Sequence, residues 1–203
     1  MAQAYDSAGK RAALVRAAKE LFYHQGFQRT SLEHVAQGAG VPLGNVHYYF
    51  STKRALALAV LDSHKADLAV TFAAWDAQIP RPQERLVALL RSPLQASEAV
   101  VRYGCPHGSL CQELEKSEDQ DIILASSELL SVWVRWSQDQ LELLGWPSRA
   151  AQRKATQLVS VIQGSMLLAH TLHSEETLSQ QLGEWEVWLD QEIRRGPAKE
   201  NPA

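Results

Sequence analysis

The sequence has little cysteine and no long hydrophobic run, and both absences narrow the possible classes of protein. Cys105 and Cys111 are the only two thiols in 203 residues, which is too few for a disulfide framework. On one helix, their spacing of six residues would separate them by about 9 Å of rise, too far for an unstrained disulfide. No apolar stretch reaches the roughly 18 residues that a membrane-spanning helix needs, so none is predicted.

Signals for secretion and for catalysis are also missing. Residues 1–13 contain neither an apolar stretch nor a signal-peptide cleavage site, so we expect a cytoplasmic protein with no membrane partner. The sequence has no nucleotide-binding loop, nucleophile elbow, zinc-protease motif or dinucleotide fingerprint. The acidic residues between Glu113 and Asp121 occupy mixed helical phases, as on a solvated face. We therefore expect neither an enzyme nor a cofactor.

The net charge is small but unevenly distributed. With 45% hydrophobic residues the chain can bury a core, which excludes general disorder. The net charge of −3 by itself disfavours a nucleic-acid partner. Residues 1–56, however, contain seven Lys and Arg against three Asp and Glu, whereas residues 57–203 contain 13 against 20. The N-terminal part thus carries +4 and the rest −7, an asymmetry that points to a charged partner on one side.

Apolar residues recur with helical period along the chain, and no alternating strand pattern is present. Leu14, Ala18 and Leu21, for example, share one face of an amphipathic helix. We expect a loop or broken turn over residues 100–106. The sequence predicts an all-α fold of about nine helices, which cover residues 10–24, 31–37, 43–50, 52–75, 82–93, 108–116, 119–144, 148–173 and 175–195.

The first three helices are short and closely spaced, and this spacing predicts a helix-turn-helix. Gly26 is expected to end the first helix. Thr30 and Glu33 have the spacing of a capping box at the start of the second helix. Gly38–Gly40 would end that helix in a tight turn, and Pro42 suits the first turn of the third.

The third helix has the residue types that a DNA-recognition helix needs. A helix that enters a major groove about 12 Å wide needs small residues and hydrogen-bonding side chains on its exposed face. Gly44 permits close approach, and Asn45 and His47 can donate to bases or phosphates. Tyr48 and Tyr49 can reach phosphate oxygens.

Two helix N-termini flank this third helix. Thr30 and Ser31 begin the second helix, and Lys53 lies at the start of the fourth, where backbone amides also favour an anion. Val46 and Phe50 are expected to be core residues. A glycine turn between helices is common in proteins that never touch DNA, so the pattern alone leaves open a DNA-binding regulator or a helical protein-interaction module.

Residues 10–61 resemble the DNA-binding domain of the tetracycline-repressor (TetR/AcrR) family of bacterial regulators. The segments Leu21–Phe27, Thr30–Ala36 and Ala39–Val41 carry part of the resemblance. The most specific segment is Gly44–Leu56, which is similar to the family pattern Gly-Thr-Leu-Tyr-Tyr-His-Phe followed by a Ser-Lys cap. The order and spacing hold without gaps over about a quarter of the chain.

The departures from the family pattern are mild. Asn45 stands where the family often has Thr, His47 where it usually has Tyr, and Tyr49 where it often has His. Each position keeps a hydrogen-bond donor, so the resemblance still implies DNA binding, with an operator preference of its own.

The resemblance implies a helix-turn-helix DNA-binding domain over residues 1–56 and a larger helical ligand-binding and dimerisation domain over residues 57–203. Such a regulator, usually a repressor, binds a palindromic double-stranded operator as a homodimer. A small-molecule effector releases it by population shift. The DNA-binding residues that the resemblance implies are Thr30, Ser31, Pro42, Leu43, Gly44, Asn45, His47, Tyr48, Tyr49 and Lys53.

The last two long helices match the place of the family's dimer interface, where two protomers would form a four-helix bundle across a two-fold axis. The alternative is that the tryptophans of the last helix simply cover the core of one protomer. The dimer residues that the resemblance implies are Gly164, Leu168, Leu172, Leu182, Trp185 and Leu189.

The effector pocket is expected among the middle helices. Several aromatic residues with a few polar groups suit a small, largely apolar or aromatic ligand, although ordinary core packing explains any single one of them as well. The candidate ligand-binding residues are Trp75, Tyr103, Cys105, His107, Trp133, Trp136, Gln163, Met166 and His170.

The segment Val101–Cys111 gives an alternative hypothesis of a thiol-based sensor. Its Gly-Cys-Pro stretch resembles one branch of the family, and Cys105 precedes a short helix near Arg102 and His107, an environment that lowers a thiol pKa. Such a thiolate reacts with electrophiles or oxidants. The simpler alternative is that Cys105 is a small buried residue with no reactive role. Cys105, His107 and Cys111 also have a spacing compatible with a metal-sensing site, but no second Cys/His cluster supports it, and no resident metal is expected.

Overall fold

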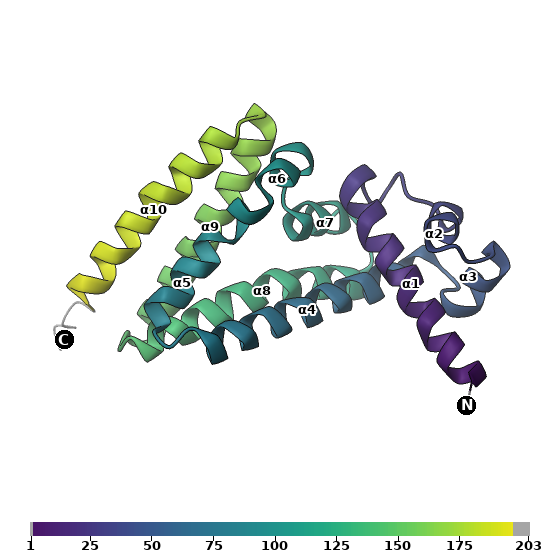
Figure 1. Cartoon of the computed structure of the whole chain (residues 1–203), viewed down its shortest axis with the longest axis horizontal. Coiled ribbons are helices and arrows are strands. Elements are labelled where there is room, and N and C mark those ends of the chain that lie inside the picture. The colour runs from purple at the N-terminus through teal and green to yellow at the C-terminus, as the bar shows by residue number, and fades with distance from the viewer. Residues whose placement is uncertain (1, 197–203) are drawn as a thin grey trace. The chain divides into compact units, whose positions relative to one another are not determined.

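The computed structural model describes residues 2–196, with side chains from residue 7 onward. All regular structure in this range is helical, which confirms the all-α prediction (Figure 1). The elements are α1 (Ala2–Gln25), α2 (Leu32–Ala39), α3 (Leu43–Tyr49), α4 (Lys53–Gln78), α5 (Pro82–Arg91), the 3-10 helix η1 (Ser92–Ala96), α6 (Ser97–Tyr103), α7 (Pro106–Leu114), α8 (Gln120–Leu143), α9 (Ser148–Leu172) and α10 (Glu175–Arg195).

The helices form two compact units. The first unit contains the residues up to Asp67 together with Pro106–Leu129, so α7 and the start of α8 belong with α1, α2 and α3. The second unit contains Leu68–Cys105 and the residues from Leu130 onward. The functional boundary expected between residues 56 and 57 lies within the continuous helix α4, and that division stays a prediction.

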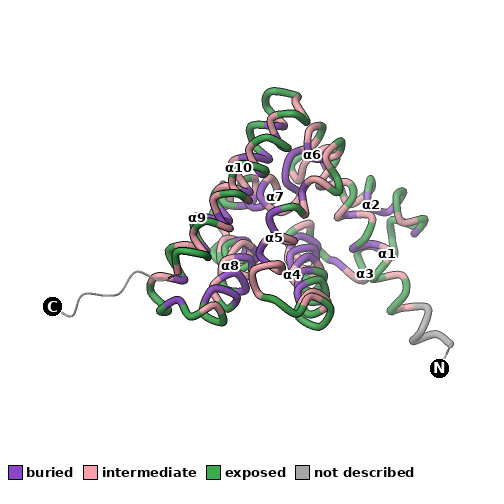
Figure 2. The backbone as a smooth tube through the Cα atoms, turned by 60° about the vertical axis from the view of Figure 1, so that its left-hand side comes forward, coloured by how far each residue is buried: buried purple, intermediate pink, exposed green. Residues whose placement is uncertain are grey.

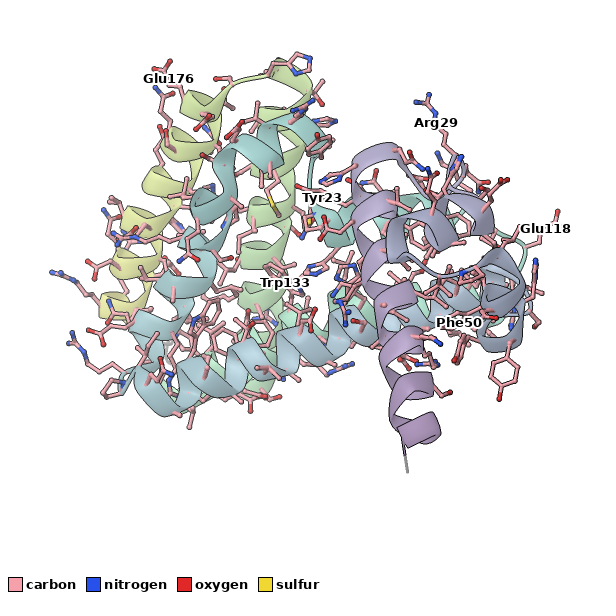
Figure 3. The ribbon with its side chains drawn as sticks, turned by 45° about the vertical axis from the view of Figure 1, so that its right-hand side comes forward. Tyr23, Arg29, Phe50, Glu118, Trp133 and Glu176 are labelled. Atoms are coloured by element: carbon pink, nitrogen blue, oxygen red, sulfur yellow. The ribbon has the colours of Figure 1, made fainter. Side chains whose placement is uncertain are left out.

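The core of the first unit lies between the inner faces of α1, α2 and α3. Leu14 of α1, Val35 of α2 and Val46 of α3 are fully buried. Phe50, which follows α3, is 2% exposed and lies against α1 (Figure 3), where the guanidinium of Arg11 is 5.0 Å from the centre of its ring. The prediction that Val46 and Phe50 are core residues is confirmed.

Local sequence sets most helix ends of this unit. Gly26 and Gly40 follow α1 and α2 with φ angles of +89° and +63°, the left-handed region that favours glycine. The hydroxyl of Thr52 accepts a hydrogen bond from the amide of Ala55 at 3.1 Å and so caps the start of α4. These ends agree with the sequence prediction.

The capping box of α2 lies one residue later than predicted. The hydroxyl of Ser31 accepts from the amide of His34 at 3.1 Å, and Nδ1 of His34 accepts from the amide of Ser31 at 3.3 Å. A histidine therefore fills the place that the sequence pattern gave to Glu33, and the prediction of a Thr30–Glu33 box is wrong.

The loop or broken turn predicted over residues 100–106 is confined to Gly104 and Cys105. Residues 97–103 form α6, and α7 begins at Pro106. Gly104, with a φ angle of +81°, ends the first of these helices. Proline and glycine here separate two short helices instead of extending the chain into a loop.

In the second unit, α5, α9 and α10 run side by side (Figure 1), and buried positions alternate with exposed ones along them (Figure 2). Arg91 of α5 forms two hydrogen bonds of 2.6 Å with the carboxylate of Glu186 on α10. The largest side chains of this layer that are no more than 1% exposed are Leu86, Leu89, Leu90, Leu158, Ile162, Leu178 and Leu182. Within residues 2–196, no helix is both long and apolar enough to cross a membrane.

Candidate nucleic-acid interface

The turn between α2 and α3 sets the direction of α3. The amide of Gly40 donates to the carbonyl of Gln37 at 3.1 Å, and the amide of Val41 donates to the carbonyl of Ala36 at 3.0 Å. Val41 and Val46 are 8% and 0% exposed, so both anchor this segment in the core of the first unit. One face of α3 is thereby fixed inward.

The opposite face of α3 is open to solvent. Tyr48 is 80% exposed, and Tyr49 is half-buried with its ring edge-on to Tyr48 at 5.0 Å. Outside its own helix, no described atom lies within 4 Å of the place that a Cβ would take at Gly44, so a groove could approach closely there. The predicted recognition residues that the structure exposes are Pro42, Leu43, Gly44, Asn45, His47 and Tyr48.

The start of α2 exposes only one of its two predicted phosphate ligands. Ser31 is exposed, whereas Thr30 is 2% exposed. The Thr30 hydroxyl donates to the carbonyl of Gly26 at 2.8 Å and accepts from Nε2 of Gln25 at 3.1 Å. The expectation that the Thr30 side chain faces phosphate is corrected, because both of its hydrogen bonds lie inside the turn.

Lys53 lies beside the turn between α1 and α2. Its ammonium group donates to the carbonyl of Gln28 at 3.2 Å and lies 4.2 Å from the centre of the Phe27 ring. Burial lowers the pKa of Lys53, and the negative charge of Glu113 acts in the opposite direction. Lys53 thus stabilises the turn, and its contact with a DNA phosphate stays a prediction.

A segment that sequence reasoning did not assign to this interface lies next to it. Glu113 of α7 accepts a hydrogen bond from the amide of Gln28 at 3.0 Å, and Arg54 forms ion pairs with Asp119 and Asp121. The hydrogen bonds with the two aspartates raise the pKa of Arg54, and the guanidinium lowers the pKa of Asp119. The prediction of a merely solvated acidic face is therefore wrong for Glu113 and Asp119, which are half-buried, whereas Asp121 is exposed as predicted.

The same segment changes the charge of the first unit. Residues 106–129 contain six Asp and Glu and one Lys. The net positive charge predicted for DNA binding belongs to residues 1–56 and not to the whole compact unit. Because the partners of Glu113 and Arg54 are 65 to 85 positions away in sequence, helical phase within one segment could not reveal them.

Four aromatic rings gather in the second unit. Phe72 stacks on Trp136 with the ring centres 4.4 Å apart, and it meets Trp133 edge-on at 6.3 Å. Trp75 lies 5.6 Å from both Phe72 and Trp136. The structure therefore brings together three of the predicted effector-binding residues, namely the tryptophans at 75, 133 and 136.

A polar network borders this aromatic cluster. Asp76 accepts from Nε1 of Trp136 at 3.2 Å and from Nε2 of Gln140 at 3.3 Å. Arg85 pairs with Asp76 at 3.3 Å and donates to the side-chain oxygen of Gln140 at 3.0 Å. These three polar residues could not be predicted from the sequence, because each lies on a different helix and its partners are distant in the chain.

Four further effector candidates of the second unit take part in its packing. Met166 is 3% exposed, and Nδ1 of His170 lies 3.0 Å from the carbonyl oxygen of Val101. The side-chain nitrogen of Gln163 is buried and has no hydrogen-bond partner among the described residues. Tyr103, at the end of α6, is half-buried.

Both cysteines are buried and neither forms a disulfide. Cys105 is 7% exposed, and Cys111 is 4% exposed with its thiol directed at the carbonyl of Ser126 at 3.3 Å. Reactive thiols are usually partly exposed, so the thiol-sensor alternative gains nothing from the burial of Cys105 and stays a hypothesis. In the part of the chain that the structure describes, no three His, Cys, Asp or Glu side chains are placed to hold a metal ion.

His107, the remaining effector candidate, belongs to the first unit, where its ring meets that of His64 edge-on at 4.8 Å. Burial lowers the pKa of His64 to about 3 and that of His107 to about 4. The positive charge of Lys19, which pairs with Asp67, lowers both values further. Both rings are therefore neutral at pH 7 and act as packed core groups.

This histidine pair predicts that the protein loses stability on acidification. Both groups have a lower pKa in the folded chain than the ordinary value of 6.5, so below pH 6.5 the unfolded chain binds more protons. Their stabilisation is complete above pH 6.5 and is lost as the pH falls toward 4. Thermal unfolding should show a loss of about 4 kcal/mol between pH 7 and pH 5, about 2 kcal/mol for each histidine.

The control for this prediction removes the pair. The double variant His64→Leu and His107→Leu should lose most of the pH dependence, whereas His24→Gln, which removes an exposed histidine, should keep it. A wild-type melting temperature that is equal at pH 7 and pH 5 would contradict the assignment.

The last two helices expose an apolar stripe. On α9 and α10, Leu168 is 47%, Leu172 60% and Val187 59% exposed. Gly164 and Trp185 are half-buried. Leu182 and Leu189 are only 1% and 4% exposed, so the prediction that they supply a dimer surface is corrected: they cover the core of the protomer.

Two family models match this chain. Residues 14–60 match the model described as bacterial regulatory proteins, tetR family. Residues 83–182 match the model described as the C-terminal domain of LmrA/YxaF-like transcriptional regulators. The first match contains α2 and α3 entirely, and the second contains α6 to α9 entirely.

Individual proteins agree with the models. The HTH-type transcriptional regulator LmrA of Bacillus subtilis is 27% identical over 168 residues, which cover 81% of this chain and 88% of the relative. An HTH-type transcriptional regulator in the lacX 3′ region of Lactococcus lactis is 26% identical over 172 residues, 82% of this chain and 86% of the relative. A solved TetR transcriptional regulator from Chloroflexus aurantiacus has the same fold, with a TM-score of 0.79 at 18% identity, covering 93% of this chain and 98% of that one.

Proposed function

Since the chain belongs to the TetR family of bacterial transcriptional regulators, we propose that it is a repressor that binds a palindromic operator as a homodimer. We further propose that a small-molecule effector releases it from DNA. The family and the relatives are transcriptional regulators and not enzymes. A repressor of this kind acts where the chromosome is, so its site of action would be the bacterial cytoplasm.

The exposed face of α3 is the observation that carries this proposal. Asn45, His47 and Tyr48 project from a helix whose other face is anchored by Val46. Such a helix, rigid on one side and polar on the other, has the form required to read base edges in a major groove. Ser31 at the start of α2 adds a hydroxyl and a helix N-terminus for a backbone phosphate.

The proposed dimer uses the apolar stripe on α9 and α10. Leu168 and Leu172 lie one helical turn apart, and both are about half exposed in the single chain. A second copy related by a two-fold axis would cover them with the same stripe. Two copies of α3 would then read the two halves of a palindrome.

The aromatic cluster of the second unit supports a planar or aromatic effector. Trp133 and Trp136 offer stacking surfaces, and the Asp76–Arg85 pair beside them offers hydrogen-bonding groups. A ligand that separates these rings would favour a different packing of the second unit. Effector release follows if that packing holds the two recognition helices at the wrong spacing.

In vitro selection tests the proposal. The wild-type chain should enrich palindromic duplexes from a random library, with an affinity that falls steeply as salt is added because phosphate contacts release counterions. A duplex with only one half-site should bind at least about ten times more weakly than the full palindrome. Failure to enrich any sequence, or binding that does not respond to salt, would contradict DNA binding through the basic N-terminal segment.

A further inference from the structure

We propose that Glu113 is a positioning residue for DNA binding, an inference that rests on the proposed function. Its carboxylate reaches from α7 to the turn between α1 and α2 and holds the backbone there. Through this turn it would fix the Ser31 end of α2 and the ammonium group of Lys53 in the places where they meet phosphates.

The contact between Glu113 and the turn is close on two sides. One carboxylate oxygen accepts from the amide of Gln28 at 3.0 Å. The other lies 2.9 Å from the position that a Cβ would take at Gly26, so a larger residue there would push the carboxylate aside. Gly26 also has a φ angle of +89°, which favours glycine at this position independently of the carboxylate.

Lys53 binds the same peptide segment from α4. Its ammonium group donates to the carbonyl of Gln28, whose amide is the donor to Glu113. Gln28 is thus held at both ends by side chains of opposite charge, one from α7 and one from α4. A charge-assisted hydrogen bond of this kind is stronger than one between neutral groups.

Hydrogen bonds within the turn would transmit this position to α2. The buried hydroxyl of Thr30 donates to the carbonyl of Gly26, and Ser31 follows as the N-cap of α2. A displacement of Gln28 therefore moves the helix end that carries the predicted phosphate contact.

A purely electrostatic role and a positioning role predict opposite results. A carboxylate near the DNA interface repels phosphates, so its removal should strengthen binding if it does nothing else. If Glu113 holds the turn, its removal should weaken binding despite the loss of a negative charge. Glu118 provides the matched control, since it is exposed and projects away from the helices (Figure 3).

The test compares Glu113→Ala, Glu113→Gln and Glu118→Gln on the duplex that the wild type selects. Glu113→Ala should weaken binding about tenfold and should flatten the dependence of affinity on salt by about one phosphate contact per protomer. Glu113→Gln keeps an acceptor for the Gln28 amide and should recover at least half of the loss on a logarithmic scale. Glu118→Gln should bind as the wild type does or slightly more tightly.

Two further readings separate positioning from folding. The melting temperature shows whether a variant is folded. If Glu113→Ala does not fold, the DNA affinity of Glu113→Gln is compared with that of Glu118→Gln instead. In the nuclear magnetic resonance spectrum, the Gln28 amide should move upfield in Glu113→Ala as its bond to the carboxylate is lost. The inference, but not the proposed function, would be overturned if the Glu113 variants fold, bind DNA as tightly as Glu118→Gln does, and show an unchanged dependence of affinity on salt. A wild type that selects no duplex would overturn the proposed function and this inference together.

Discussion

The double replacement of Asn45 and Tyr48 by alanine is expected to lower the affinity for the selected operator by at least about 100-fold. Both side chains lie on the exposed face of α3, and Tyr48 is the most exposed large residue of that helix at 80%. A lost side-chain contact to a base edge costs about 1–3 kcal/mol, and the dimer loses each contact twice. Fluorescence anisotropy with the labelled duplex measures the change.

Two controls make this result specific. Leu124→Ala removes a side chain that is 63% exposed on α8, and it should leave DNA affinity unchanged. The double variant should melt at the wild-type temperature, because neither side chain contributes to the core. Retention of wild-type affinity by the double variant would show that α3 is not the recognition helix.

Replacement of Leu168 and Leu172 by glutamate should convert the protein from a dimer to a monomer. The two leucines lie on the apolar stripe of α9, and a carboxylate buried there without a partner costs several kcal/mol. The dimer dissociation constant should therefore rise by at least about 1,000-fold. Sedimentation equilibrium measures the mass in solution, and operator affinity should fall in parallel because only one half-site is then read at a time.

Val70→Glu is the matched control for the dimer prediction. Val70 is 72% exposed on α4, so the substitution also adds a carboxylate at an exposed apolar position, but away from the stripe. It should leave both the mass and the affinity unchanged. A dimer that persists at micromolar concentration with glutamate at both positions 168 and 172 would place the interface elsewhere on the chain.

Sequence periodicity was sufficient for the fold class and for the core of the helix-turn-helix. Val46 and Phe50 were predicted as core residues because one face of a short helix must pack inward, and both are buried. The glycine at position 40 marked the end of α2 because a left-handed residue is needed there. These features depend on residues only a few positions apart, so they can be predicted from the local sequence.

Features that depend on distant partners could not be predicted in this way. Glu113 was assigned to a solvated face, because its partner Gln28 lies 85 positions earlier in the chain. Leu182 and Leu189 were assigned to a dimer surface, whereas they are buried inside one protomer. On a helix with several apolar positions, the sequence alone does not separate those that face the core from those that face a partner.

Nuclear magnetic resonance can map where the operator contacts the protein. Amide chemical shifts of the labelled protein should be recorded with and without the selected duplex. If α3 is the recognition helix, the largest changes should fall on residues 42–49, with further changes at Ser31 and Lys53. Changes confined to α5, α9 and α10, or no change on addition of any selected duplex, would contradict that assignment.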